Sequence, residues 1–182
     1  MVSWYYGLLA LIACERIAEL FLSRHNARIA FSHGAVESGA HHFRVMTVLH
    51  LLFLPCCAVE ASFRAFPGLL GWTSLALALA AQGLRWWAIG SLGWRWNVRV
   101  IAIPGEPPLR RGPYRFVRHP NYVAVCLEML FVPLIHGAWI CAAAFSLANA
   151  LLLRVRIRAE EQALGGAYQQ AFDGVPRFLP HG

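Results

Sequence analysis

Long apolar runs constrain this chain more than any other feature of its sequence. Three of them each offer about the 20 helical residues that cross a bilayer, namely 3–22, 45–63 and 69–92. A fourth run, 122–153, is long enough for two crossings, because Gly137 permits a tight turn at 136–139. We therefore predict an all-α integral-membrane bundle of about five transmembrane helices with a C-terminal helical hairpin and a tail.

Composition leads to the same class of protein. Only 14% of the residues are charged and the mean hydropathy is +0.50, which lies outside the usual range of soluble domains. With 182 residues, the chain has room for one bundle but not for a separate soluble catalytic domain. We expect a single membrane-embedded domain over 1–182, so any catalytic residues must belong to the bundle.

The arginines predict how the bundle lies in the membrane. They supply all sixteen basic residues, and most of them fall in the segments 23–44, 93–119 and 154–182, which five crossings place on one side. By the positive-inside rule this side is the cytoplasm, so the N-terminus lies outside and the tail is cytoplasmic. Since topology alone explains the net charge of +7, we expect no nucleic-acid partner.

Charged residues inside the apolar runs need partners, because an unpaired charge in hydrocarbon costs about 3 kcal/mol. Glu15 and Glu19 are four residues apart and share one helix face. We expect them to pair with arginines such as Arg85, with a direct part in catalysis as the alternative. The same choice applies to Glu128.

The cysteines and histidines show no metal-binding pattern. No C-x-x-C spacing links the five cysteines, all of which lie in apolar stretches: Cys14, Cys56, Cys57, Cys126 and Cys141. No H-E-x-x-H spacing links the histidines of the first polar segment: His25, His33, His41 and His42. We expect no metal site.

The segment 111–125 (RGPYRFVRHPNYVAV) predicts a rigid cationic loop at the start of a helix. Gly112 and Pro113 break regular structure, while Pro120 suits the first turn of a helix and holds His119 extended. The N-terminus of such a helix exposes unpaired N–H groups, and the surrounding arginines suit it to an anionic or carboxylate-bearing ligand. The tyrosines add aromatic faces for a flat ring or a sulfonium cation.

A second polar segment, 154–172, follows the last apolar run. If the helix continues through it, Arg156 and Glu160 face together, with Glu161 adjacent. A carboxylate there can accept two ribose hydroxyls or an ammonium group, and the arginine can hold an acidic group by a two-pronged contact. An ordinary solvated helix with ion pairs between turns is the simpler alternative.

Together these segments resemble the isoprenylcysteine carboxyl methyltransferase family and its relatives, the integral-membrane phospholipid methyltransferases. The similarity rests on GPYRFVRHPNY at 112–122, RIRAEE at 156–161, Tyr168 and VPRFLP at 175–180. It implies a small all-helical bundle that binds S-adenosylmethionine in a cytoplasm-facing pocket built largely from 93–182. It also implies that no Rossmann domain is present.

The resemblance assigns roles to individual residues. It implies that the cofactor site is formed by His119, Pro120, Tyr122, Tyr114, Arg118, Glu160 and Glu161, with Gly112 shaping the loop. Arg156 would orient the acceptor, and His119 or a glutamate would act as the base for a phenol or an enol. A carboxylate acceptor would need no base.

The acceptor depends on the N-terminal half. Residues 23–50 resemble a bacterial subgroup of the family that is associated with O-methylation of type III polyketide lipids, which implies a lipophilic small-molecule acceptor met in a bacterial inner membrane. Methylation of an isoprenylcysteine carboxylate or of a phospholipid amine is the first alternative. A non-enzymatic membrane or transport protein that depends on Glu15, Glu19 and Glu128 is the second, because a fold does not fix a function.

Overall fold

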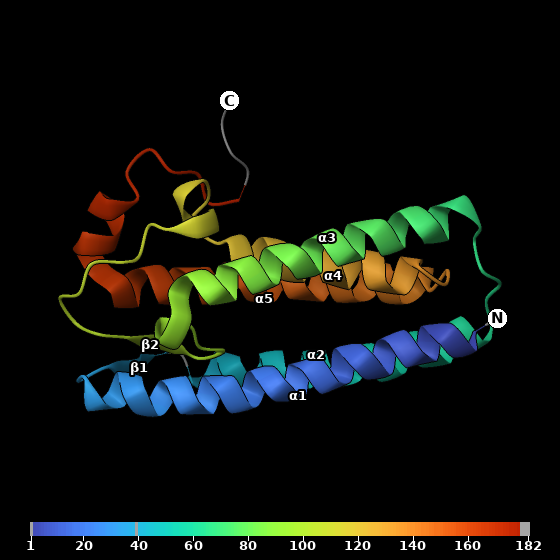
Figure 1. Ribbon diagram of the computed structural model, residues 1–182, viewed down its shortest axis with the longest axis horizontal. Helices are drawn as coiled ribbons and strands as arrows, with labels where there is room; N and C mark the ends of the chain where they lie inside the picture. Colours follow the sequence, from blue (N-terminus) through green and yellow to red (C-terminus); the bar gives the residue numbers. More distant parts are fainter. Residues whose placement is uncertain (1, 39, 179–182) are drawn as a thin grey trace.

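The computed structural model describes residues 2–38 and 40–178 of the chain. It is dominated by five helices (Figure 1). Their bounds are α1 Ser3–Ser32, α2 Ala40–Ser62, α3 Leu69–Leu92, α4 Pro120–Leu134 and α5 Trp139–Ala171. Two single 3₁₀ turns, η1 (Gly93–Arg95) and η2 (Gly112–Arg115), and two short strands lie between them. The predicted helical bundle is confirmed at this level.

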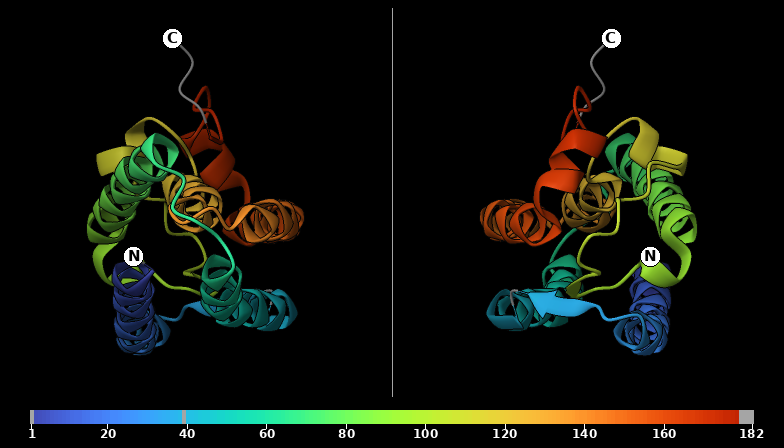
Figure 2. Two further views of the ribbon diagram at one scale, coloured as in Figure 1. Left: turned by 90° about the vertical axis from the view of Figure 1, so that its right-hand side faces the viewer. Right: turned by 90° about the vertical axis from the view of Figure 1, so that its left-hand side faces the viewer.

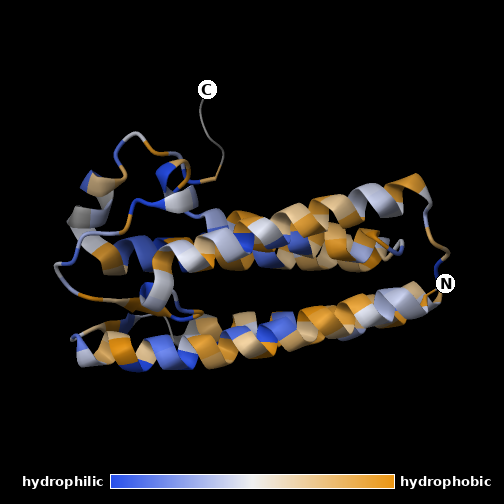
Figure 3. Cartoon of the chain, in the orientation of Figure 1, coloured by the Kyte–Doolittle hydropathy of each residue, from blue (hydrophilic) through white to orange (hydrophobic). Residues whose placement is uncertain are grey.

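The helices form two layers (Figure 2). One layer holds α1 and α2, and the other holds α3, α4 and α5, with α4 between its neighbours. The segment between α3 and α4, the N-terminus of α4 and the C-terminal part of α5 gather at one end, which we call the polar end of the bundle (Figure 1). Apolar residues dominate the rest of the helices (Figure 3).

Two helices are long and apolar enough to cross a membrane. The qualifying stretches are Phe43–Ser62 in α2 and Trp139–Gly166 in α5, and Pro120–Leu134 is a shorter apolar helix. α3 has the bounds expected of a crossing, and α1 begins where one was expected. The count of five crossings therefore stays a prediction, although all five helices are present.

Two segments expected to be loops contain regular structure instead. α1 continues ten residues beyond the apolar run, to Ser32. The chain then forms β1 (Val36–Ser38), which pairs antiparallel with β2 (Val100–Ala102) through the register Glu37↔Ile101. The all-α expectation thus missed a small ribbon that ties the end of α1 to the segment after α3.

The helical hairpin predicted for the fourth apolar run is confirmed. α4 ends at Leu134, the chain turns through 135–138, and α5 begins at Trp139. Gly137 adopts φ 71°, a conformation that favours glycine, so the turn lies at the predicted position. α5 then continues past the apolar run to Ala171, with a kink at Gly165, so the polar segment is helical as well.

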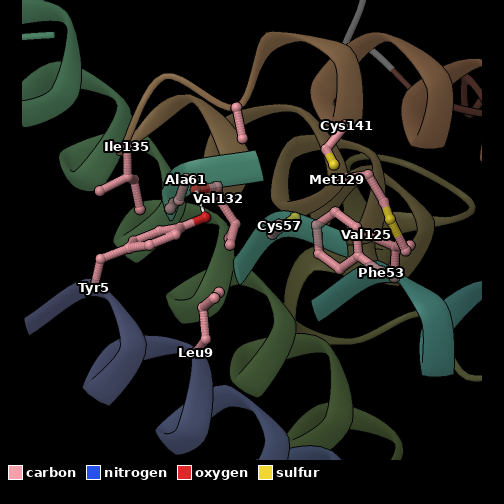
Figure 4. Packing of buried hydrophobic residues seen from close by; sticks show 12 residues of the cluster. Tyr5, Leu9, Phe53, Cys57, Ala61, Val125, Met129, Val132, Ile135 and Cys141 are labelled. Atoms are coloured by element: carbon pink, nitrogen blue, oxygen red, sulfur yellow. Dashed lines mark hydrogen bonds between the residues drawn. The ribbon is translucent and has the colours of Figure 1, made fainter. Parts of the chain in front are cut away.

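The main apolar core joins the two layers away from the polar end (Figure 4). Tyr5 of α1 is fully buried, and its hydroxyl donates to the Val132 carbonyl of α4 at 3.0 Å. Phe53 and Cys57 bring α2 into the same cluster. In a membrane bundle, close packing of such side chains and the buried hydrogen bond of Tyr5 hold the two layers together, because no apolar surface is removed from water.

Charged side chains inside the bundle are paired. Arg85 of α3 donates from Nε and Nη2 to the two carboxylate oxygens of Glu19, at 2.6 and 2.7 Å. Arg16 contacts Glu15 at 3.0 Å and Glu19 at 3.1 Å, and Glu128 lies 3.7 Å from both arginines. The expected pairing with Arg85 is confirmed for Glu19, whereas Glu15 pairs with Arg16.

Candidate active site

The loop before α4 is held against α3. Gly112 has φ 56°, and a Cβ at this position would overlap the Ser91 side chain and crowd Trp87. Only glycine therefore lets η2 approach α3 so closely. The turn buries Tyr114, and α4 begins at Pro120 as the sequence predicted, with His119 as its N-cap residue. The expected extended conformation of His119 is wrong, because its ψ is 57°.

The C-terminal tail covers this loop. The backbone N–H of Arg118 donates to the Pro176 carbonyl at 2.9 Å, and that of His119 donates to the Arg177 carbonyl at 3.2 Å. The Arg118 side chain also donates from Nε to the Val175 carbonyl. The sequence motif at 175–180 thus acts through its backbone, although Leu179 and Pro180 lie outside the described residues.

The His119 ring sits in a polar cluster between the loop, α5 and the tail. Its Nε2 lies 3.1 Å from the Glu161 carboxylate and 3.3 Å from the Tyr168 hydroxyl. Glu161 also accepts two hydrogen bonds from Arg177, at 3.0 and 2.7 Å. Since His119 is 4% exposed, this arrangement fixes the ring in one orientation at the start of α4.

A second cluster joins α4 to α5. The Tyr122 hydroxyl donates to the Glu160 carboxylate and accepts from Arg156 Nε at 2.8 Å. The Tyr122 ring also stacks on His119, with centroids 5.3 Å apart. The two motifs that the sequence set apart by some forty residues therefore form one continuous polar surface.

Arg156 links this surface to the N-terminal half of the chain. Its Nη1 lies 3.1 Å from the Met46 sulfur of α2, and its Nη2 donates to the Val98 carbonyl just before β2. The guanidinium is 6% exposed, so these partners hold it rigidly. The β1–β2 ribbon and α2 thus position a residue that belongs to the C-terminal motif.

A cavity of about 660 Å³ opens beside these groups and runs between the two layers. Its polar end is lined by Tyr114, Arg118, His119, Asn121, Tyr122, Arg156, Glu160 and Leu164. Its opposite end is mainly apolar and is lined by residues that include Tyr6, Leu9, Leu51, Leu54 and Ala58. One space therefore connects a charged, aromatic end to an apolar end.

The structure brings most of the predicted site residues to this cavity. Six of them line it: Tyr114, Arg118, His119, Tyr122, Arg156 and Glu160. Two do not: Pro120 is buried in the first turn of α4, and Glu161 points to His119 and Arg177. Glu160 and Glu161 are thus directed to different partners, a distinction that the sequence left open.

Several contributors were missed from the sequence. Asn121 lines the cavity, and its buried Oδ1 has no hydrogen-bond partner among the described residues. Its position inside the H-P-N-Y motif was a usable signal. Met46 and Val98 carried none, because an apolar side chain gives no hint of a contact with Arg156, and Val98 makes its contact through its backbone carbonyl.

Burial keeps the site tyrosines neutral. Removal from water raises the pKa of Tyr168 above its usual value, and the nearby Glu160 and Glu161 carboxylates raise it further. The pKa of Tyr114 is raised by burial and by Glu160 in the same way. Both hydroxyls therefore remain protonated at physiological pH and can serve as hydrogen-bond donors.

Comparison with known proteins decides the family. The model of the isoprenylcysteine carboxyl methyltransferase (ICMT) family matches residues 74–166, which carry η2, α4, most of α5 and the polar end of the cavity. The chain belongs to the ICMT family. This membership makes it a membrane methyltransferase, in agreement with its apolar helices.

The relatives cover nearly the whole chain. An uncharacterized protein of Bacillus subtilis, YpbQ, is 36% identical over 161 residues, which are 88% of this chain and 96% of that protein. An uncharacterized protein of Haemophilus influenzae is 24% identical over 168 residues, covering 89% and 95%. The similarity to these proteins therefore extends well beyond residues 74–166.

A solved structure shares the fold. The eukaryotic intramembrane Ras methyltransferase ICMT, determined without a monobody, matches with a TM-score of 0.53 and 25% identity. The match covers 72% of this chain and 49% of that one, so the chain spans about half the length of the eukaryotic enzyme. Most of this chain therefore shares its fold with part of the eukaryotic enzyme.

Proposed function

We propose that this protein is an S-adenosylmethionine-dependent O-methyltransferase that acts on a lipophilic small molecule, such as a polyketide lipid. The observation that carries the proposal is that one continuous cavity has Tyr122, Arg156 and Glu160 at its polar end and apolar side chains at its other end. A water-soluble methyl donor and a lipid-soluble acceptor can meet in such a space. We further propose that the polar end faces the cytoplasm of a bacterium, because most arginines lie there.

The polar end fits the methyl donor. Among the described residues the Asn121 amide oxygen has no partner, and the Glu160 carboxylate lines the cavity, so both can accept hydrogen bonds from ribose hydroxyls or an ammonium group. Arg118 lies at the same end and suits the donor's carboxylate. The aromatic ring of Tyr114 suits a sulfonium cation, whereas the Tyr122 ring is occupied by His119 and Arg156 and contributes through its hydroxyl. When bound, S-adenosylmethionine supplies an activated methyl group.

The chain's own contribution to the reaction is alignment. Arg156 is fixed on three sides by Tyr122, Met46 and Val98, so it can orient an oxygen of the acceptor without rearranging. The His119 ring lines the cavity while its Nε2 contacts the Glu161 carboxylate, so we assign His119 as the group that takes a proton from a phenol or an enol. We assign Arg156, Glu160 and His119 to the reaction centre.

The first alternative concerns the acceptor. An isoprenylcysteine carboxylate would also place an acidic group on Arg156 and an apolar chain in the cavity. A phospholipid amine would need a carboxylate where Arg156 stands, which makes the cationic end of the cavity less suitable for it. A non-enzymatic or transport role would depend on the charges at Glu15, Glu19 and Glu128 rather than on the polar end.

The test is calorimetric binding of S-adenosylmethionine to detergent-purified protein, with Tyr122→Ala and Glu160→Gln beside the wild type. Binding that is lost in both folded variants supports the methyltransferase site, and radiolabelled methyl transfer into lipid extracts then identifies the acceptor. A well-folded wild-type protein that binds no methyl donor would refute the proposal. Transfer to a farnesylcysteine analogue in place of phenolic lipids would favour the first alternative.

A further inference from the structure

A second hollow lies on the other side of the α4–α5 pair. It measures about 510 Å³ and has an apolar floor formed by Val123 and Leu127 of α4 together with Ala150 and Leu153 of α5. Leu153 also lines the active-site cavity, so the two spaces lie on opposite sides of the same helices. We call this second space the α4–α5 groove.

Arginines gather at one end of the groove. Arg154, Arg158 and Arg177 all line it, and all three are exposed. Arg154 and Arg158 are four residues apart, so they stand one above the other on the same face of α5. Over 2–38 and 40–178, neither of these two guanidinium groups has a hydrogen-bond or ion-pair partner.

The apolar floor suits the hydrocarbon core of a membrane, and the arginines suit its polar surface. α4 contributes to the floor as a short apolar helix, and α5 contributes its part from within Trp139–Gly166, a stretch long and apolar enough to cross a membrane. The arginines follow toward the polar end, where the α5 segment leaves its apolar run. An occupant must therefore be apolar over its length and anionic at its end near the tail.

We propose that the α4–α5 groove binds an anionic phospholipid. Its acyl chain would lie on Val123, Leu127 and Ala150, and its phosphate would be held by Arg154 and Arg158. A soluble anion would leave the apolar floor without a partner. A zwitterionic lipid carries no net charge to match two unpaired arginines.

The groove also touches the active site through the tail. Arg177 lines the groove while its Nε and Nη2 hold Glu161, and Glu161 in turn holds His119. Phe178, beside it, lines the groove as well. A phospholipid in the groove would contact the tail on the face away from the methyltransferase cavity.

The test measures lipid retention and does not depend on methyl transfer. Purified protein in mixed micelles is offered phosphatidylglycerol or phosphatidylcholine of the same acyl chains, and bound lipid is counted by native mass spectrometry. The variant is Arg154→Gln with Arg158→Gln. The matched control is Arg28→Gln with Arg115→Gln, which removes the same charge from two exposed arginines outside the groove.

We expect wild-type protein and the control to retain phosphatidylglycerol in preference to phosphatidylcholine. The groove variant should bind phosphatidylglycerol about thirtyfold more weakly, since each arginine facing an anionic lipid contributes about 1 kcal/mol. Ala150→Phe, which fills the floor but keeps the arginines, should also lower retention. Equal retention of both lipids by the wild type, or an equal loss in the control, would overturn the proposal.

Discussion

Arg156 Nε donates to the Tyr122 hydroxyl at 2.8 Å, and the same hydroxyl donates to Glu160. One phenol thus stands between a fixed cation and a fixed anion. Because Tyr122 is almost fully buried, its hydroxyl sets the distance between the residue assigned to the acceptor and the residue assigned to the methyl donor.

Removing this hydroxyl should impair the site without unfolding the chain. In Tyr122→Phe the ring still packs, but Arg156 and Glu160 lose a shared partner, and hydrogen bonds to charged groups are worth about 1.5–3 kcal/mol. We expect methyl-donor affinity or turnover to fall about ten- to hundredfold, measured by calorimetry and radiolabel transfer. The control Tyr5→Phe loses a different buried bond and should lower thermal stability while leaving donor affinity intact.

Glu161 should act by positioning His119 rather than by touching a ligand. Glu161→Gln keeps the size of the side chain but weakens its contacts with Arg177 and His119. We expect a lower rate of transfer and a smaller loss of donor affinity than Glu160→Gln gives. The control Glu37→Gln breaks another ion pair, with Arg99, and should change neither quantity. Equal losses from Glu161→Gln and Glu160→Gln would contradict this division of roles.

The close approach of η2 to α3 can be tested at one glycine. Gly112→Ala must adopt a positive φ and also overlap Ser91, so we expect a loss of about 3 kcal/mol of stability and a lower melting temperature in detergent. Gly105→Ala has φ 80° but no atom within 4 Å of the added Cβ, so it should cost only about 1 kcal/mol. Equal melting temperatures of the two variants would show that the contact with Ser91 is not the reason for glycine at position 112.

The buried pair of Glu19 and Arg85 should matter more for stability than for chemistry. Glu19→Gln leaves Arg85 without its two-pronged partner, and breaking a buried pair costs about 3–5 kcal/mol. We expect a large drop in thermal stability, with donor affinity preserved at low temperature. Loss of donor binding in a folded Glu19→Gln protein would instead give this cluster a functional part.

The acceptor end of the cavity should be separable from the donor end. Leu54→Trp narrows the apolar part, so we expect labelled methyl transfer into lipid extracts to fall while calorimetric donor affinity stays unchanged. Leu52→Trp, on the exposed face of the same helix, is the matched control and should affect neither. A fall in donor affinity in Leu54→Trp would show that the two ends are not independent.

Local patterns predicted much of this structure. The start of α4 at Pro120 follows from proline chemistry, and the hairpin turn follows from Gly137 in a long apolar run. Arg156 and Glu160 share a helix face because they are four residues apart. These features depend on neighbours in sequence, which is why the sequence could reveal them.

Other features depend on contacts that no local pattern encodes. The β1–β2 ribbon is three residues long on each side and joins segments more than sixty residues apart. Packing of the two layers brings Arg156 into contact with Met46 and Val98. Packing of the tail brings Arg177 to Glu161, to which it donates a hydrogen bond. The same packing directs Glu160 to Tyr122 and Glu161 to His119.

Different parts of the chain form the two ends of the cavity that lies between the layers. Its donor end is built by α4 and α5, while α1 and α2 supply much of the apolar wall. Under the proposed function, substitutions in the first sixty residues would change which acceptor the cavity admits and leave the methylation chemistry unaltered. Chimaeras joined between α2 and α3 offer a direct route to enzymes with new acceptors.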